Sequence, residues 1–291
     1  TAGKPVFVEA DGDFLMPTSS TATTTYSTGS MTEILAGTIN QVTGLDYDAS
    51  AERFVVVYHD AANSNRTSAK LLTVGSDKSL TVTATQELTT TSNGMEYPDV
   101  IYDPVAEKTL LVYQDGSNTS DLRCRVLTIG ASSVTIGSEV IIDDSNSTAT
   151  DINLTYDTVN SKIIVYTRDQ SNSSYPTAYV GSISGTTPTF TAAQVITSAA
   201  AGVVLDATSG NGSTLFTYRD GNNDLASFAG TLSGTTFSFG SIHEIDSNYP
   251  DSYNSRRTSA CYDSQNNRFV QTFRTNESND PLYAVVVAVD G

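Results

Sequence analysis

The sequence predicts an all-β fold: a five-bladed β-propeller of four-stranded blades, its last blade closed by an N-terminal strand, preceded by a short N-terminal arm. Three observations predict it. One motif recurs five times at intervals near 50 residues, strand-forming residues dominate each copy, and no window places apolar residues at helical spacing over three turns. Repeats of this length without helices are typical of propellers, with one repeat for each blade.

The repeated motif is a Tyr-Asp pair, followed after four residues by Lys or Arg and then by an apolar stretch. A second Asp follows seven residues after the basic position. Asp accepts backbone N–H groups and tolerates tight turn angles, so both aspartates are interpreted as turn residues rather than as a fivefold active site. The first set is Asp48, Asp103, Asp157, Asp263 and, in a degenerate Leu205-Asp206 copy with Ser213 at the basic position, Asp206; the second set is Asp60, Asp115, Asp169 and Asp220.

Each copy divides into four short strands separated by Asp, Asn, Ser, Gly or Pro. The strands expected in the second copy are Asp99–Tyr102, Thr109–Tyr113, Leu122–Thr128 and Ser133–Ile142.

The two ends of the chain predict how the ring closes. The fifth copy ends with its third strand, Leu282–Val289, whereas residues 25–36 near the N-terminus match the pattern of a fourth strand. An unpaired strand edge invites unwanted pairing, so we expect residues 25–36 to pair with Leu282–Val289 and complete the last blade.

Residues 1–20 lie outside the repeats, and residues 21–291 form the expected propeller. Two apolar patches flank an Asp-Gly turn in the arm, and a short hairpin is marginally stable alone in water. We expect these side chains to be covered by a neighbouring chain, or alternatively by the ring's own face. The proposed assembly residues are Val6, Phe7, Phe14, Leu15 and Met16.

The charge balance excludes two classes of partner. Fifteen basic and 32 acidic residues give a net charge of −17, which repels nucleic acid and anionic membrane surfaces. No apolar run reaches membrane-spanning length and no signal peptide is recognised. Cys124 and Cys261 fall in different copies, so no disulfide between them is expected.

Motifs for nucleophilic, phosphate-binding or zinc chemistry are absent from the sequence. His59 and His243 are expected at solvated surface positions. No cofactor is expected, although the acidic loops Asp143–Asn146 and Asp220–Asp224 leave calcium binding open. A glycosidase would need carboxylates facing the central channel, and first-strand candidates exist; with no tryptophan in the chain, tyrosine would have to form the sugar platform. These candidates are Asp46, Asp99, Asp151 and Asp206.

The repeat resembles the degenerate propeller repeats of tailed-phage virion proteins. The sequence similarity is strongest at Tyr156–Ile196, and the N-terminal segment Lys4–Asp13 also resembles the segment that precedes the repeats in those proteins. That resemblance implies tail-fibre, adhesin or capsid-decorating subunits and no catalytic residues.

The sequence therefore favours a non-enzymatic structural or host-adhesion protein, displayed on the surface of a phage virion and anchored to other virion proteins by its arm. A host surface glycan or receptor is an additional expected partner. Two alternatives stay open: a carbohydrate-binding, lectin-like propeller and a secreted five-bladed glycosidase.

Overall fold

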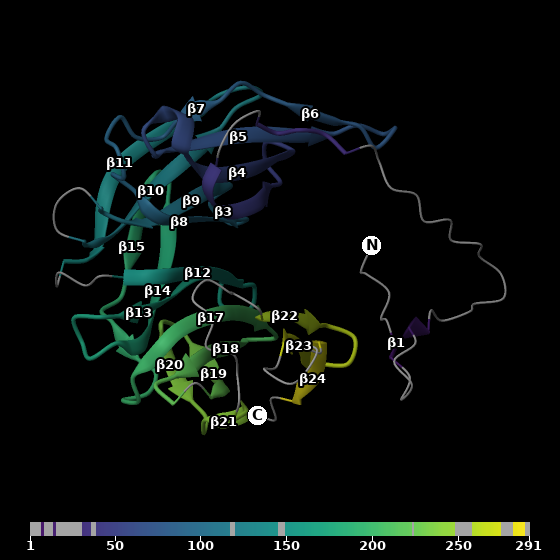
Figure 1. The fold of residues 1–291 in the computed structure, drawn as a ribbon, viewed down its shortest axis with the longest axis vertical. Coiled ribbons are helices and arrows are strands. Elements are labelled where there is room, and N and C mark those ends of the chain that lie inside the picture. Colours follow the sequence, from purple (N-terminus) through teal and green to yellow (C-terminus); the bar gives the residue numbers. More distant parts are fainter. Residues whose placement is uncertain are drawn as a thin grey trace.

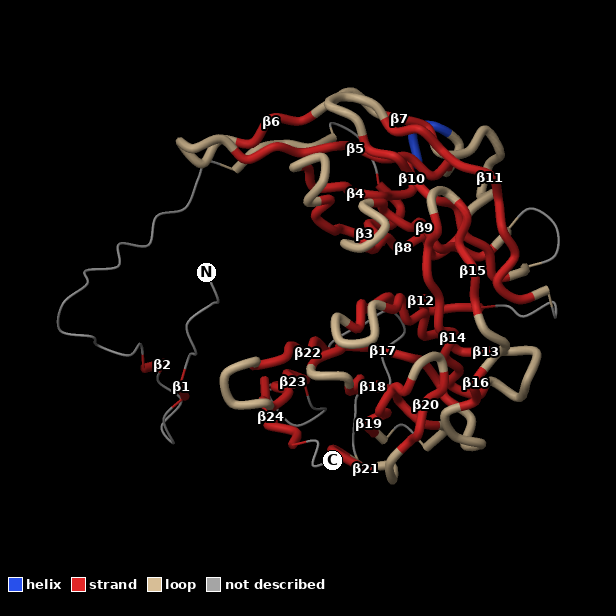
Figure 2. The backbone as a smooth tube through the Cα atoms, turned by 180° about the vertical axis from the view of Figure 1, so that it is seen from behind, coloured by secondary structure: helices blue, strands red, loops and turns tan. Residues whose placement is uncertain are grey.

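The computed structural model describes residues 7–8, 14–15, 31–35, 39–116, 120–144, 149–222, 224–247, 258–274 and 282–288. In these ranges the chain forms strands, turns and one short 3₁₀-helix, η1 (Ala61–Asn63), and no α-helix (Figure 2). No helix there has the length and hydropathy needed to cross a membrane. The expected all-β fold is confirmed.

Five antiparallel sheets follow one another along the chain. The first contains β3 (Ile39–Asp48), β4 (Arg53–Asp60), β5 (Arg66–Val74), β6 (Leu80–Val82) and β7 (Gln86–Glu87). The second contains β8 (Glu96–Asp103), β9 (Lys108–Gln114), β10 (Leu122–Ile129) and β11 (Val134–Asp143). The third contains β12 (Ala149–Asp157), β13 (Lys162–Asp169), β14 (Tyr175–Ser184), β15 (Thr187–Phe190) and β16 (Gln194–Val195).

The fourth sheet contains β17 (Ala201–Gly210), β18 (Ser213–Asp220), β19 (Leu225–Ser233), β20 (Thr236–Phe239) and β21 (His243–Asp246). The fifth contains β22 (Thr258–Asp263), β23 (Arg268–Arg274) and β24 (Leu282–Ala288). A separate pair joins β1 (Phe7–Val8) to β2 (Phe14–Leu15). In the first, third and fourth sheets, two short segments that both pair with the third strand take the place of a continuous fourth strand.

The sheets lie along an open arc that runs from β3 to β24, with the first strand of each sheet toward the centre (Figure 1). These inner strands lie side by side in the order β3, β8, β12, β17 and β22. No hydrogen-bonded ladder between the described residues joins one of the five sheets to another.

The core lies between the sheets. The second strands of the first four sheets are apolar on both faces, and the faces turned toward an adjacent sheet pack against it. Val55 and Val57 of β4 belong to one buried cluster with Leu111 and Tyr113 of β9, for example. Equivalent clusters join the second sheet to the third, the third to the fourth and the fourth to the fifth.

An aliphatic side chain at the end of the outer strand packs onto the core shared with the following sheet. Leu88, Ile142, Ile196 and Ile245 take this position after the first four sheets. Ile34 and Leu35 pack in the same way against β4 and β5 of the first sheet. Residues 34–35 therefore stand where the end of a preceding outer strand is expected.

The expected pairing of residues 25–36 with Leu282–Val289 is not seen among the described residues. Residues 25–30 and 36 lie outside the described ranges, residues 31–35 form no strand, and β24 pairs only with β23. A five-bladed ring therefore remains an inference.

The turn role of the first set of aspartates is confirmed in four copies. Asp48 Oδ1 accepts hydrogen bonds from the Ala51 amide at 3.0 Å and the Ser50 hydroxyl at 2.6 Å. Asp103, Asp157 and Asp263 each accept two backbone amides in the same turn. Arg53 donates to the Glu52 carbonyl, and no ion pair within the described ranges joins it to Asp48.

Turn roles also hold for three aspartates of the second set. Asp60 Oδ1 accepts the Ala62 amide and caps η1. Asp169 and Asp220 each accept two amides of the following loop. Asp115 forms an ion pair with Arg123 at 3.2 Å, and residues 117–119 of the loop that follows it lie outside the described residues.

The alignment of the fourth copy was wrong. Gly210, not Asp206, lies opposite Ser213 and is equivalent to Asp157 and Asp263, each 53 residues away. Asn211 and Gly212 form the connecting two-residue turn with φ of 50° and 76°. Positive φ at both positions fits a two-residue hairpin turn. This turn has no longer loop whose backbone amides would need an aspartate as acceptor.

Replacing Asp48 with alanine should destabilise the fold more than the same change at Asp263. Asp48 is 1% exposed and also accepts the hydroxyl of Thr109 in the next sheet at 2.9 Å. Leaving these buried donors without an acceptor should lower the free energy of unfolding by about 3 kcal/mol in urea titrations. Asp263→Ala is the matched control because its turn bonds are exposed. An equal loss in both variants would show that the contact between sheets contributes nothing.

Candidate active site

The inner strands of the first three sheets line a cavity of about 470 Å³. β3 contributes Asp46 and Tyr47, β8 contributes Asp99 and Tyr102, and β12 contributes Tyr156. Two carboxylates and the tyrosines of three consecutive repeats therefore meet in one place. Leu45, Val100, Ile101, Pro104, Leu154 and Thr155 complete the lining.

Asp46 is held by backbone groups from two sheets. Its Oδ1 accepts the Tyr47 amide at 2.8 Å, and its Oδ2 accepts the Tyr102 amide of the next sheet at 2.6 Å. Burial raises the pKa of the Asp46 carboxyl above its usual range, although both hydrogen bonds act in the opposite direction. The group is therefore fixed in orientation and favours its protonated form more than an ordinary aspartate does.

Asp206 repeats this arrangement between the fourth and fifth sheets. Its two oxygens accept the Ala207 amide at 2.9 Å and the Ala260 amide of β22 at 2.6 Å. Asp206 does not line the cavity of the first three sheets. Asp206 thus shares the hydrogen-bond pattern of Asp46 away from the cavity, although it lies four residues before the turn position Gly210 whereas Asp46 lies two before Asp48.

Asp99 and Asp151 lie at irregular positions of their strands. The register of β8 shifts between Glu96 and Asp99, and that of β12 shifts between Thr150 and Asn153. Such bulges change the direction of side chains near functional sites. Asp99 Oδ1 accepts the Val100 amide at 2.9 Å, whereas Asp151 lies 3.7 Å from the Arg168 guanidinium.

The tyrosines give the cavity flat apolar surfaces with hydroxyl groups. Tyr47 is 41% exposed and its ring lies 4.8 Å from that of Phe54. The Tyr156 hydroxyl donates to Asp103 Oδ1 at 3.3 Å. Burial and the Asp103 charge raise the pKa of Tyr156 to about 12, which keeps this hydroxyl protonated at neutral pH. Stacking against the CH faces of a sugar is within the capacity of such rings.

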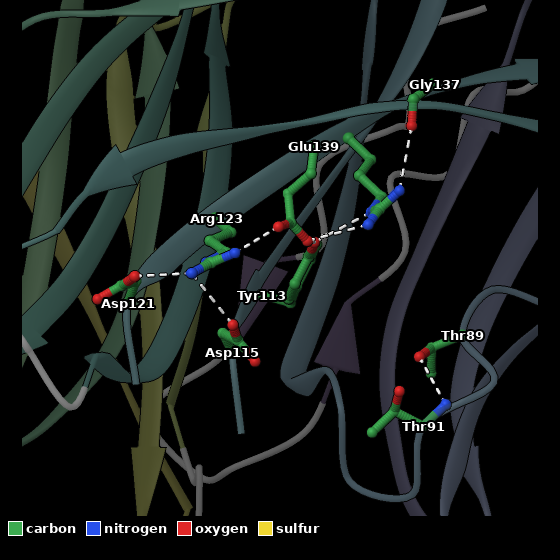
Figure 3. A network of polar contacts seen from close by, with 9 residues as sticks. Thr89, Thr91, Tyr113, Asp115, Asp121, Arg123, Gly137 and Glu139 are labelled. Atoms are coloured by element: carbon green, nitrogen blue, oxygen red, sulfur yellow. Dashed lines mark hydrogen bonds and ion pairs between the residues drawn. The ribbon is translucent and has the colours of Figure 1, made fainter. Parts of the chain in front are cut away.

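A second polar cluster lies on the outer strands of the second sheet (Figure 3). Glu139 of β11 accepts hydrogen bonds from the Tyr113 hydroxyl, from Arg123 and, at 3.0 Å, from Arg125. Arg123 also donates to Asp121 at 2.8 Å. The charges of this cluster are mutually paired, so it is a structural network and not a site for an external ligand.

The structure also places the two histidines and the two cysteines. His59 was expected at the surface, but it is only 7% exposed and its Nε2 lies 2.6 Å from the Met95 carbonyl oxygen. His243 is exposed, as expected. Both cysteines are free; burial raises the pKa of Cys124 to about 12.

Among the described residues no group of three or more His, Cys, Asp or Glu side chains is placed to hold a metal ion. Ser145, Asn146 and Asn223 of the two acidic loops lie outside those residues. Asp220 instead uses Oδ1 to bind the amides of its own loop.

The arm contains the expected hairpin at the level of the backbone. Phe7 pairs with Leu15 and Val8 with Phe14. Val6 and Met16 lie outside the described residues, and assembly through the arm stays a prediction.

Comparisons with known proteins find similarity in structure only. No family model matches the sequence, and no curated protein matches it. The exo-β-1,3-galactanase of Phanerochaete chrysosporium, solved with β-1,3-galactotriose, matches with a TM-score of 0.50 at 9% identity, over 98% of this chain and 63% of that chain. This chain thus spans less than two thirds of the length of that enzyme.

Two further solved structures match with TM-scores below 0.50. A putative exo-β-1,3-galactanase of Bifidobacterium bifidum matches with a TM-score of 0.48 at 11% identity, over 86% of this chain and 88% of that one. A GH43 β-xylosidase/α-arabinofuranosidase from a compost metagenome matches with a TM-score of 0.47 at 10% identity, over 90% and 96%. At 9% identity the likeness to the Phanerochaete chrysosporium galactanase concerns the fold alone.

These findings overturn the expectation of a non-enzymatic virion structural or adhesion protein, and with it the expectation that the chain is not an enzyme. The matching structure with a TM-score of 0.50 is an exo-β-1,3-galactanase, which is an enzyme. The expectation rested on the turn roles of the repeated aspartates, and spacing could not tell which first-strand acids share a site; Asp46 and Asp99 lie outside those turns and line a cavity. The resemblance to phage virion repeats and a location on a virion stay predictions.

Glu139→Gln should remove a pH-dependent part of the stability. Burial alone would raise the pKa of Glu139, but the hydrogen bonds from Tyr113 and Arg123 and the charge of Arg125 outweigh it and lower the pKa below 4.5. A lowered pKa stabilises the fold above the unfolded-state value, and this contribution disappears as pH falls through the folded-state value. Urea unfolding should therefore separate wild type from Glu139→Gln at pH 7 and bring them together near about pH 3. A difference that grows toward acid pH would contradict this account.

Proposed function

We propose that the chain is a glycoside hydrolase that acts at the cavity formed by β3, β8 and β12. The observation that carries the proposal is the meeting of Asp46 and Asp99, from adjacent inner strands, with three tyrosines in that cavity. Paired carboxyl groups beside flat aromatic surfaces meet the chemical needs of glycosidic bond cleavage.

The environments of the two acids support different roles. Asp46, whose pKa is raised by burial, is the proton donor to the glycosidic oxygen that leaves. Asp99 on the adjacent strand is the carboxylate that acts on the opposite side of the sugar, either on the anomeric carbon or on a water molecule. Tyr47, Tyr102 and Tyr156 orient the sugar rings.

The similar solved structures suggest which substrates to test first. The galactanase of Phanerochaete chrysosporium was solved with β-1,3-galactotriose, and the compost enzyme with xylotriose. We propose short β-linked oligosaccharides of neutral sugars as the substrate class. The net charge of −17 also disfavours anionic polysaccharides.

We also propose that this site lies within a five-bladed ring of four-stranded blades. Five consecutive sheets with adjoining inner strands support the blade count. A complete ring would surround the inner strands and restrict access of water to the two acids.

Asp46→Asn and Asp99→Asn should each lower kcat/KM on the responsive trisaccharide by roughly 10²–10⁴-fold, because each removes a proton-transfer or nucleophilic group. Asp206→Asn is the matched control for Asp46→Asn: it alters the same pair of backbone hydrogen bonds away from the cavity and should retain near wild-type activity.

Hydrolysis is measured by chromatography of the products of β-1,3-galactotriose and xylotriose, with binding followed by calorimetry in parallel. Trisaccharide that binds without being cleaved would replace the hydrolase proposal by a carbohydrate-binding role. Equal activity in all three variants would exclude Asp46 and Asp99 as the acid pair.

A further inference from the structure

The fifth sheet ends in an exposed apolar strand. Among the described residues β24 pairs with β23 on one side only, whereas the third strands of the other four sheets pair on both sides. Leu282 is 74% exposed and Val286 is 64% exposed. An apolar edge of this kind is a template for another strand.

An apolar groove of about 580 Å³ lies between the fourth and fifth sheets. Phe228 and Phe239 line it from the fourth sheet, and Val285 and Val287 line it from the fifth. The fourth sheet shows what fills the corresponding space one sheet earlier. There Phe237 of the outer strand β20 packs into the core shared with the third sheet and is 7% exposed. In the fifth sheet Phe273 packs into the shared core from the second strand, β23, and no described residue takes the outer-strand position of Phe237.

The chain carries a close copy of that outer strand before its first sheet. Residues 25–34 read TYSTGSMTEI, and residues 236–245 read TFSFGSIHEI. Six of the ten positions are identical without a gap, and Tyr26 stands at the position of Phe237. The structure supports this alignment at its far end, since Ile34 and Ile245 both pack onto the core of the sheet that follows them.

We propose that residues 25–30 of the same chain bind along β24, with the Tyr26 ring in the groove between the fourth and fifth sheets. Binding there brings the first sheet next to the fifth and converts the arc of Figure 1 into a ring. The groove is then the place where the fold is completed and is not a ligand site. This inference does not depend on the proposed hydrolase activity.

The fourth sheet also defines the register. Ser213 and Arg268 are equivalent, because each is the first residue of the second strand in its sheet. Ser213 lies opposite Thr231 on the third strand, and Arg268 lies opposite Ala288. Thr231 in turn pairs with Ser238, which aligns with Ser27. Ser27 is therefore placed opposite Ala288.

The test is a disulfide cross-link in the full chain with Cys261 replaced by serine; Cys124 is buried and stays. Ser27→Cys with Ala288→Cys should oxidise to an intrachain disulfide, because directly opposed residues have the spacing that a disulfide requires. The control pair, Ser27→Cys with Ala284→Cys, is displaced by four residues, about 13 Å along the strand, and should stay reduced. Mass spectrometry of non-reduced peptides and gel mobility identify the bond.

Three results would overturn the inference. They are no disulfide in the matched pair, equal bonding in both pairs, and a disulfide-linked dimer, which would make a second copy the occupant of β24.

As an independent readout, Tyr26→Ala should lower Tm by roughly 5–10 °C through the lost packing. Val105→Ala is the control, since Val105 is 70% exposed and should leave Tm unchanged. An unchanged Tm for Tyr26→Ala would mean that the groove is not filled by this ring.

Discussion

The structure depends on the packing of apolar sheet faces against one another. Val55, Val56 and Val57 are consecutive and all buried, because β4 contacts apolar side chains on both faces. Since every sheet needs a neighbour on each face, the sheets follow one another in a series, and the sheet at the end of the series exposes what the others bury. The exposure of Val286 and the groove beside Val285 both follow from this constraint.

Features that depend on neighbours in sequence were predictable. The strands of the second copy agree within three residues at each end with β8 to β11, because turn residues separate them clearly. The turn role of Asp48 was also predictable, since its acceptor oxygen bonds to amides two or three residues away. The all-β class needed only the absence of helical periodicity.

Features that depend on contacts between sheets were not predictable. The Thr109 hydroxyl reaches Asp48 from 61 residues away, and the Tyr102 amide reaches Asp46 from 56 residues away. His59 has a polar side chain, but it is buried and its ring nitrogen lies 2.6 Å from the Met95 carbonyl oxygen, 36 residues away. Asp206 was aligned with the turn aspartates although it lies four residues before the equivalent position, Gly210, because the turn at Asn211-Gly212 is shorter than in the other copies. In the same way, spacing could list four first-strand acids, and only the geometry brought Asp46 and Asp99 into one cavity.

We propose that this cavity binds a sugar between Asp46 and Asp99. A crystal structure of Asp99→Asn with β-1,3-galactotriose tests it most directly, because the variant retains the aromatic surfaces while cleavage is removed. We predict sugar rings against Tyr47, Tyr102 and Tyr156, with a glycosidic oxygen within hydrogen-bonding distance of the Asp46 carboxyl group. An empty cavity at saturating trisaccharide, or sugar bound away from the inner strands of the first three sheets, would contradict the account.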